Sequence, residues 1–280
     1  MEDLDRRRNL VEDRLEEVLA AVDPPALARS LDHVTLAGGK RIRPTVTVLT
    51  CEALGGQPHD AIDYAVGIEL VHTASLVVDD IIDESRIRRG EESAWVAFGH
   101  GPAIIASDGL LGEAFELFAD EPAALDVVTE ALIELGQGEA VELVDYPSTE
   151  AEYRSLARRK TGALFRAAAK LGAIAAEQSD ETIDAMGEYA ERVGIAFQMR
   201  DDVLDATAES EKLGKPTGRD VSMERPSLLR VTGVTPAEAN DRARVEADAA
   251  VSALGRVDGL DGQARTYLTE LASFAVERDR

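Results

Sequence analysis

Two clusters of aspartates are the residues in this sequence whose type and spacing best fit chemistry. The first cluster consists of Asp79, Asp80 and Asp83 and directly follows the apolar run "GIELVHTASLVV". In a helix, positions 79 and 83 lie one turn apart on the same face, where like charges destabilise the helix unless a counter-charge is present. Mg²⁺ can supply that charge, because it binds through one or two carboxylates together with substrate phosphates. The cluster therefore predicts a metal and phosphate site.

The same D-D-x-x-D pattern recurs at Asp201, Asp202 and Asp205, again at the end of a long apolar run, "AERVGIAFQM". A single copy is weak evidence, because the chain has 54 acidic side chains and the alternative is one more patch of acidic surface. Two copies, neither on a solvated face of its helix, favour a working site over that alternative.

The lysines are few and their positions are informative. Only five of the 30 basic residues are lysine, and three of those five lie in turns marked by glycine or proline. They are Lys40 in "GGKRIRP", Lys160 in "RRKTGALF" and Lys215 in "LGKPTGRD". A compact ammonium group suits a phosphate, and the forked arginine side chain suits it equally. Arginines that can join the lysines are Arg43, Arg88 and Arg89. Together with the aspartates they predict a pocket for a metal-bridged diphosphate.

Helical periodicity indicates which elements must position these residues. Strand signals are nearly absent, and apolar residues recur at three- and four-residue spacing in the long segments. The spacing predicts helices over 10–22, 61–84, 123–144 and 182–206.

Two further segments complete the expected organisation. The run 45–56 is β-branched and ambiguous by itself, but it follows Pro44 and ends in two glycines, which favours a helix with proline at its first position. Segment 206–232 is rich in glycine, proline and charge and is predicted to be a mobile lid. No other linker is evident, so we expect one all-α domain over 1–280.

Composition excludes several classes of function. The formal net charge of −24 speaks against nucleic acid as a partner, because a polyanion is repelled. No apolar run approaches a membrane span, and the N-terminal segment lacks the apolar core of a signal peptide, so a cytoplasmic protein is expected. The single cysteine, Cys51, is predicted to be a small core residue. The preference for arginine over lysine in an acidic chain resembles halophilic proteins.

The order of the motifs resembles that of the trans-isoprenyl diphosphate synthases, also called polyprenyl synthetases. These enzymes elongate allylic diphosphates with isopentenyl diphosphate. The matching stretches are "GGKRIRP" at 38–44, "HTASLVVDDIIDESRIRRG" at 72–90, "GQGEAVEL" at 136–143, "RKTGALF" at 159–165, "FQMRDDVLD" at 197–205 and "LGKPTGRD" at 213–220. The resemblance implies the isoprenoid synthase fold, an antiparallel helix bundle around a deep central cavity, and a homodimer.

The resemblance also implies roles for individual residues. Asp79 and Asp83, supported by Asp80, match the positions that bind Mg²⁺ bridged to the allylic diphosphate. Asp201, with Asp202 and Asp205 nearby, matches the position of the remaining ion, and three Mg²⁺ ions are expected in all. The positions that hold the allylic diphosphate correspond to Arg88, Lys160, Thr161, Gln198 and Lys215. Those that hold isopentenyl diphosphate correspond to Lys40, Arg43, His72 and Arg89.

Three of these residues have plainer alternatives on sequence grounds. His72 lies on an apolar helix face and could be a core histidine. Gln198 could pack or cap within its own helix, and Thr161 could cap the helix that follows it. The flanking motifs favour the binding role for all three.

Product length in this family depends on the side chains just before the first aspartate cluster. Ser75 and Ala74, four and five residues before Asp79, are both small, which implies a product longer than fifteen carbons. Val71 and Ile68 lie further back on the same helix and could form the floor of the pocket or leave it open. We therefore predict geranylgeranyl diphosphate, C20, with C25 or longer as the main competitor.

Two departures from the family pattern keep other readings open. Arg225 in "MERPSLL" stands where the family commonly has a lysine, and a helix of some 25 residues is missing after it. A partner subunit of a heteromeric synthase would explain this altered region, although such subunits typically lose aspartates and all six remain. A terpene cyclase shares the fold, but it does not need the site implied by "GGKRIRP".

Overall fold

The computed structural model describes residues 2–213, 225–260 and 262–277. Apart from one short hairpin, the regular secondary structure of this part is helical, which confirms the predicted all-α class. The elements are α1 (Glu2–Ala20), α2 (Pro25–Thr35), α3 (Ile42–Ala53), η1 (Pro58–Asp60), α4 (Ile62–Ile82), β1 (Ile87–Arg88), β2 (Glu91–Glu92), α5 (Ala94–Phe98), α6 (His100–Phe118), α7 (Pro122–Val144), α8 (Glu150–Ala157), η2 (Arg158–Gly162), α9 (Ala163–Ala175), α10 (Asp180–Leu213), α11 (Leu228–Thr232), α12 (Pro236–Leu254) and α13 (Gly262–Glu277).

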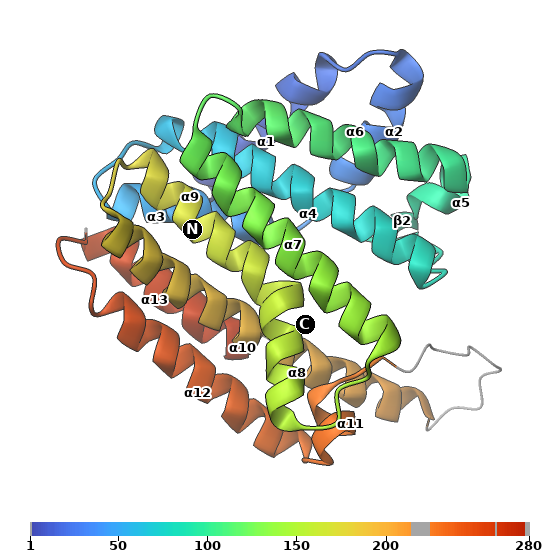
Figure 1. Cartoon of the computed structure of the whole chain (residues 1–280), viewed down its shortest axis with the longest axis vertical. Helices are drawn as coiled ribbons and strands as arrows, with labels where there is room; N and C mark the ends of the chain where they lie inside the picture. Colours follow the sequence, from blue (N-terminus) through green and yellow to red (C-terminus); the bar gives the residue numbers. More distant parts are fainter. Residues whose placement is uncertain (1, 214–224, 261, 278–280) are drawn as a thin grey trace.

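α4 is the helix that carries the first aspartate cluster, and its sequence places it in the interior. Its apolar residues are nearly continuous, so it has buried side chains on every face instead of one apolar stripe. It packs against α1, α3, α6 and α9, and Figure 1 shows α6 lying alongside it. The position of the aspartates at its C-terminal end is therefore fixed by the packing of the rest of α4 in the core.

α10 carries the second cluster and is the longest described helix, with 34 residues. It packs against α9 and α12, and the main apolar core runs from Val11 in α1 to Val276 in α13. Among the described helices, none is both long enough and apolar enough to cross a membrane.

The helices predicted from periodicity are confirmed. The predicted ranges 10–22, 61–84, 123–144 and 182–206 overlap α1, α4, α7 and α10. The run 45–56 is also helical, as α3, and it ends next to Gly55 with a positive φ of 90°. Its predicted start is wrong, because α3 begins at Ile42 and Pro44 is its third residue. The first turn of a helix has no intrahelical partners for its N–H groups, so proline is tolerated there beyond the first position.

The ends of the predicted lid, 206–232, are helical. α10 continues to Leu213, and α11 occupies Leu228–Thr232. Residues 214–224 lie outside the described part of the chain, so the mobility of this segment stays a prediction.

A two-stranded hairpin follows α4, and sequence periodicity did not predict it. Ile87 pairs with Glu92 and Arg88 pairs with Glu91. The two residues between the strands, Arg89 and Gly90, both have positive φ, 53° and 90°. Positive φ at both central residues is the turn geometry that matches the twist of a tight hairpin. The turn brings its two arginines back toward α4.

A π-helical turn, η2, joins α8 to α9. It spans Arg158–Gly162 and contains both Lys160 and Thr161 of the predicted allylic site. Such turns widen the helix locally and occur often at functional sites. The helix therefore changes its side-chain register at the two residues that the motif marks.

Candidate functional site

One cavity of about 430 Å³ gathers the predicted site residues from α3, α4, the hairpin, η2 and α10. The first and last of these residues, Lys40 and Asp205, are 165 positions apart in the chain, so only the fold brings them together. The predicted residues that line the cavity are Lys40, Arg43, His72, Ser75, Asp79, Arg88, Arg89, Lys160, Thr161, Gln198, Asp201 and Asp205. Lys215, also predicted to bind substrate, lies outside the described residues.

The cavity is locally basic in an acidic protein. Among the described lining residues the acidic side chains are Glu69, Asp79, Glu139, Asp201 and Asp205. The basic side chains are Lys40, Arg41, Arg43, Arg88, Arg89, Lys160 and Arg225. A basic excess inside a chain of net charge −24 is a suitable environment for a polyanionic substrate.

The three aspartates of the first cluster have different surroundings. Asp79 lines the cavity, and burial raises the pKa of its carboxyl against the opposing effect of Lys160. Asp80 is 3% exposed and accepts hydrogen bonds from Arg88 Nε at 2.9 Å and Nη2 at 2.5 Å. Asp83 ends α4 and accepts a hydrogen bond from Arg225. Asp80 therefore orients Arg88, and Asp79 faces the cavity directly.

The second cluster divides in the same way. Asp201 and Asp205 line the cavity. Asp202 is 8% exposed and lines a second cavity, which shares Lys160, Gln198, Asp205 and Arg225 with the first. Its carboxylate accepts hydrogen bonds from the Tyr153 hydroxyl at 2.6 Å, the Leu228 amide at 2.7 Å and the Gln198 side chain at 3.0 Å. In this structure its oxygens are occupied by protein donors, so the role expected for Asp202 beside the remaining ion stays a prediction.

The donors fit magnesium. Within residues 2–213, 225–260 and 262–277, no three His, Cys, Asp or Glu side chains are grouped closely enough to hold an ion by themselves. Mg²⁺ does not require such a group, since it is bound through one or two carboxylates, waters and substrate phosphates. Asp79 and Asp201 supply hard oxygen ligands in the same cavity, and a cation would offset the burial of Asp79.

Lys160 is held at the cavity wall by two glutamates of α7. Its ammonium lies 3.1 Å from Glu139 and also contacts Glu142. Burial lowers the pKa of Lys160, but the two glutamates outweigh it and the net shift is upward, so the side chain stays charged. Both glutamates belong to "GQGEAVEL", a motif that matched the family and to which no role was assigned from sequence. The signal that could have identified them is their spacing, since Glu139 and Glu142 lie one helical turn apart in that motif.

Thr161 and Gln198 form one hydrogen-bonded unit. Thr161 Oγ1 donates to Gln198 Oε1 at 2.7 Å, and Gln198 Nε2 donates to Asp202 one turn further along α10. Thr161 lies inside the π-helical turn and does not cap the next helix. Gln198 both packs within α10 and lines the cavity, so the two alternatives raised for it are not exclusive.

His72 and Arg43 lie in the most cationic part of the cavity. Burial lowers the pKa of His72 well below its usual value, and Arg43 and Arg89 lower it further. His72 is therefore a neutral imidazole. Burial also lowers the pKa of Arg43, to about 10, and its guanidinium lies 4.8 Å from the Phe165 ring centroid. Arg43 Nε is buried without a hydrogen-bond partner in the described residues, as expected of a group that binds a ligand.

The residues predicted to set product length are not equivalent. Ser75 lines the cavity. Ala74 and Val71 are 1% and 0% exposed and belong to the apolar core, and the Ala74 carbonyl accepts a hydrogen bond from Ser107. Apolar side chains that line the same cavity are Ile42, Leu76, Leu135, Leu164, Phe165 and Phe197. They form an apolar wall beside the charged groups.

Comparison with known proteins gives the family. Residues 24–253 match the family model described as polyprenyl synthetase. The chain belongs to the polyprenyl synthetase family. It is 37% identical to the geranylgeranyl diphosphate synthase of Methanosarcina mazei over 82% of this chain and 74% of that one. It is 33% identical to the geranylfarnesyl diphosphate synthase of Aeropyrum pernix over 92% of this chain and 96% of that one.

The likeness extends to solved structures of the polyprenyl synthetase family. A polyprenyl synthase from Caulobacter crescentus, complexed with calcium and isoprenyl diphosphate, superposes with a TM-score of 0.85 at 28% identity, covering 99% of this chain and 98% of that one. The chain therefore has the isoprenoid synthase fold and is a trans-prenyl diphosphate synthase, in a family that uses divalent metal ions. Its relatives make products of different lengths, so membership alone leaves the product open.

Proposed function

We propose that the chain condenses isopentenyl diphosphate with allylic diphosphates and makes geranylgeranyl diphosphate, C20. The observation that carries the proposal is Ser75, a small side chain at the cavity wall one helical turn from Asp79. A small residue there leaves room for a tail longer than fifteen carbons. A C25 or longer product, as made by the Aeropyrum relative, is the second candidate.

We assign the two substrates to two groups of cavity residues. The allylic site consists of Arg88, Lys160, Thr161 and Gln198, with Lys215 outside the described residues. The isopentenyl site consists of Lys40, Arg43, His72 and Arg89. Guanidinium and ammonium groups bind phosphate oxygens strongly, and the neutral imidazole of His72 can donate one hydrogen bond without repelling the arginines around it. Arg225 replaces the usual lysine and keeps its positive charge at the cavity.

The reaction breaks the allylic C–O bond, and the diphosphate leaves with the electron pair. The double bond of isopentenyl diphosphate then attacks the allylic cation, a C–C bond forms, and a proton passes to an oxygen of the departed diphosphate. No aspartate is needed as a base. Lys160 and Arg88 stabilise the charge that develops on the leaving group, and the apolar wall keeps water from the cation.

Asp79, Asp83 and Asp201 would hold Mg²⁺, three ions in all, with Asp205 nearby. When bound, these ions neutralise the developing charge of the diphosphate. Asp83 must exchange its contact with Arg225 to take part.

Product analysis tests the proposal. The purified protein, at high salt with Mg²⁺, is incubated with labelled isopentenyl diphosphate and dimethylallyl, geranyl or farnesyl diphosphate, and the products are sized. We expect C20 product, its loss with EDTA or in Asp79→Ala, and its retention in Asp241→Ala, which alters an exposed residue of α12. A C25 product would favour the second candidate. No elongation from any primer would sink the enzyme proposal and favour a partner subunit or a cyclase.

We further propose a cytoplasmic homodimer. Ile104 and Ile105 on α6 are 51% and 58% exposed, and a partner chain would cover this apolar pair. Light scattering at high salt measures the mass, and a monomer at micromolar concentration would contradict this part of the proposal.

A further inference from the structure

Arg41 lies between Lys40 and Arg43 of the proposed isopentenyl site, yet its own side chain is only 1% exposed. It is the N-cap residue of α3 and has a left-handed backbone conformation, with φ 47° and ψ 41°. This conformation is unfavourable for a residue with a Cβ atom, and it persists only where surrounding contacts hold it. The contacts of Arg41 therefore determine the path of the loop on either side of it.

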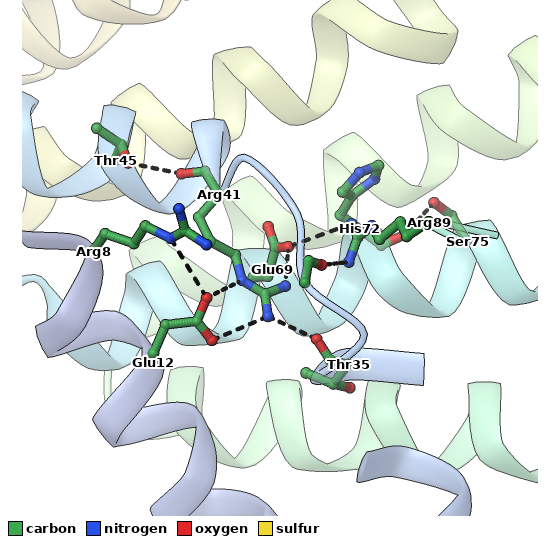
Figure 2. Close-up of polar contacts among 10 residues, drawn as sticks. Arg8, Glu12, Thr35, Arg41, Thr45, Glu69, His72, Ser75 and Arg89 are labelled. Atoms are coloured by element: carbon green, nitrogen blue, oxygen red, sulfur yellow. Dashed lines mark hydrogen bonds and ion pairs between the residues drawn. The ribbon is translucent and has the colours of Figure 1, made fainter. Parts of the chain in front are cut away.

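The Arg41 guanidinium joins three helices (Figure 2). Its Nε and Nη2 donate to the two carboxylate oxygens of Glu12 on α1, at 2.8 and 3.1 Å. Its Nη1 donates to Glu69 on α4 at 2.7 Å, and Nη2 also donates to the carbonyl of Thr35, the last residue of α2, at 2.6 Å. A single lysine ammonium cannot reproduce this fork of donors. All of these bonds tie Arg41 to the scaffold, so it is not available to a substrate.

Glu69 extends the network to the hairpin. It is 2% exposed, and its Oε1 accepts from Arg41 and lies 3.8 Å from Nη2 of Arg89. Burial lowers the pKa values of Arg43 and Arg89, and for both arginines the charge of Glu69 is the largest effect that raises the pKa. One buried carboxylate thus serves as the shared counter-charge of three arginines at the isopentenyl site.

Arg89 in turn holds the glycine loop before Arg41. Its Nη1 donates to the Gly38 carbonyl at 2.5 Å. A Cβ atom at Gly39 would lie 2.9 Å from Arg89 Cζ, so the backbone of this loop rests directly on the guanidinium. The loop is therefore held from one side by Arg89 and from the other by Arg41.

We propose that Arg41 is a positioning residue which, through Glu12 and Glu69, fixes the geometry of the isopentenyl site. This inference rests on the proposed function, and it adds residues that touch no substrate. The network contacts the loop before α3 and the hairpin residue Arg89, and no hydrogen bond or ion pair joins it to Arg88, Lys160, Thr161 or Gln198, the described residues of the allylic site. Its loss should therefore impair one substrate selectively.

Steady-state kinetics of Arg41→Lys and Glu12→Gln test this proposal, with each substrate varied in turn. We expect Arg41→Lys to raise the KM for isopentenyl diphosphate about tenfold, because small misplacements of binding groups are costly, and to leave the KM for farnesyl diphosphate unchanged. Glu12→Gln should act in the same direction but more weakly, because the Glu69 and Thr35 contacts remain. The rise in the KM for isopentenyl diphosphate of the double variant should be smaller than the product of the two single rises, since both substitutions break the same interaction.

Arg14→Lys is the matched control. Arg14 also joins α1 to α4, through a 2.7 Å hydrogen bond from its Nε to Asp63, but it lies outside the cavity. It should change neither KM. Equal rises of both KM values in Arg41→Lys, or no change, would overturn the positioning role. Should the wild-type protein prove inactive, calorimetry can still test the positioning role by comparing the affinity of wild type and of Arg41→Lys for isopentenyl diphosphate. Equal affinities would overturn that role.

Discussion

The hydroxyl of Tyr153 donates a 2.6 Å hydrogen bond to the carboxylate of Asp202 and so joins α8 to α10 inside the core. The two side chains are 1% and 8% exposed. The same carboxylate oxygen accepts from the Leu228 amide at the start of α11. One aspartate of a metal-type motif thus connects three helices, next to Asp201, which faces the cavity.

Tyr153→Phe should lower the free energy of unfolding by about 1–2 kcal/mol, because a buried carboxylate loses one of its donors. Urea denaturation measures the change. Tyr146→Phe is the control, since Tyr146 is 48% exposed and its hydroxyl makes a long, 3.4 Å contact with the Arg225 carbonyl. The control should stay within about 0.5 kcal/mol of wild type. Equal stability of Tyr153→Phe and wild type would refute the structural role of Asp202.

Ser75→Phe should shorten the product, because the new ring projects into the cavity next to Asp79. The comparison variant is Ala74→Phe. Sequence alone predicts that it also shortens the product, but Ala74 is buried in the core, so it should in addition cost roughly 1–3 kcal/mol of stability through overpacking. Product sizing and thermal melts separate the two effects. A full-length product from Ser75→Phe would contradict the assigned tail path.

Glu139 should make stability depend on pH. Burial raises the pKa of its carboxyl from 4.5 to about 7, against the lowering effect of Lys160. Between those values the folded state keeps a proton that the unfolded state has released, so wild-type stability falls as pH rises from 4.5 to 7. Glu139→Gln removes this effect. The difference in Tm between the variant and the wild type (variant minus wild type), measured in EDTA, should therefore rise from pH 5 to pH 7.

Glu152→Gln serves as the control for that titration. Hydrogen bonds from Ser148 lower the pKa of Glu152, so its contribution is complete above pH 4.5 and is lost only below it. Its Tm difference from wild type should be flat between pH 5 and pH 8. A flat difference for Glu139→Gln as well would show that Glu139 is not perturbed.

Cys51 should be inert to thiol reagents in the folded protein. It is fully buried, and burial raises the pKa of its thiol to about 12, so almost no thiolate is present at neutral pH. Labelling at pH 7 to 9 should remain negligible in buffer and reach one equivalent in guanidinium. Rapid stoichiometric labelling of the native protein would contradict the packing of α3.

Gly172→Ala should destabilise the protein by about 3 kcal/mol or more, since overpacking a tight contact forces the backbone to move. A Cβ atom there would lie 2.2 Å from the Thr47 carbonyl oxygen, where α9 crosses α3. Gly136→Ala on α7 is the control, because nothing lies within 4 Å of its added Cβ, and it should gain about 0.5–1 kcal/mol. A change in the free energy of unfolding with the same sign for both variants would contradict this prediction.

Sequence reasoning reached the elements and most of the cavity. Periodicity of 3.6 residues is a local property, so α4 and α10 could be predicted without a fold. Carboxylates at the ends of apolar helices need a counter-charge, which a shared metal and phosphate site supplies. Asp79 and Asp201 do line one cavity. The hairpin at Arg88 was missed, because strands of two residues have no period to detect.

The sequence by itself determined the helical class, the two acidic clusters and the basic residues that accompany them, because these depend on residue type and spacing along the chain. Only the tertiary structure decided which aspartates face the cavity and which are taken up by protein donors, as Asp202 is. It alone placed the buried side chains of Arg41 and Glu69 in contact next to the loop that carries Lys40. Burial and partner choice depend on contacts between segments distant in sequence, and no local pattern encodes them.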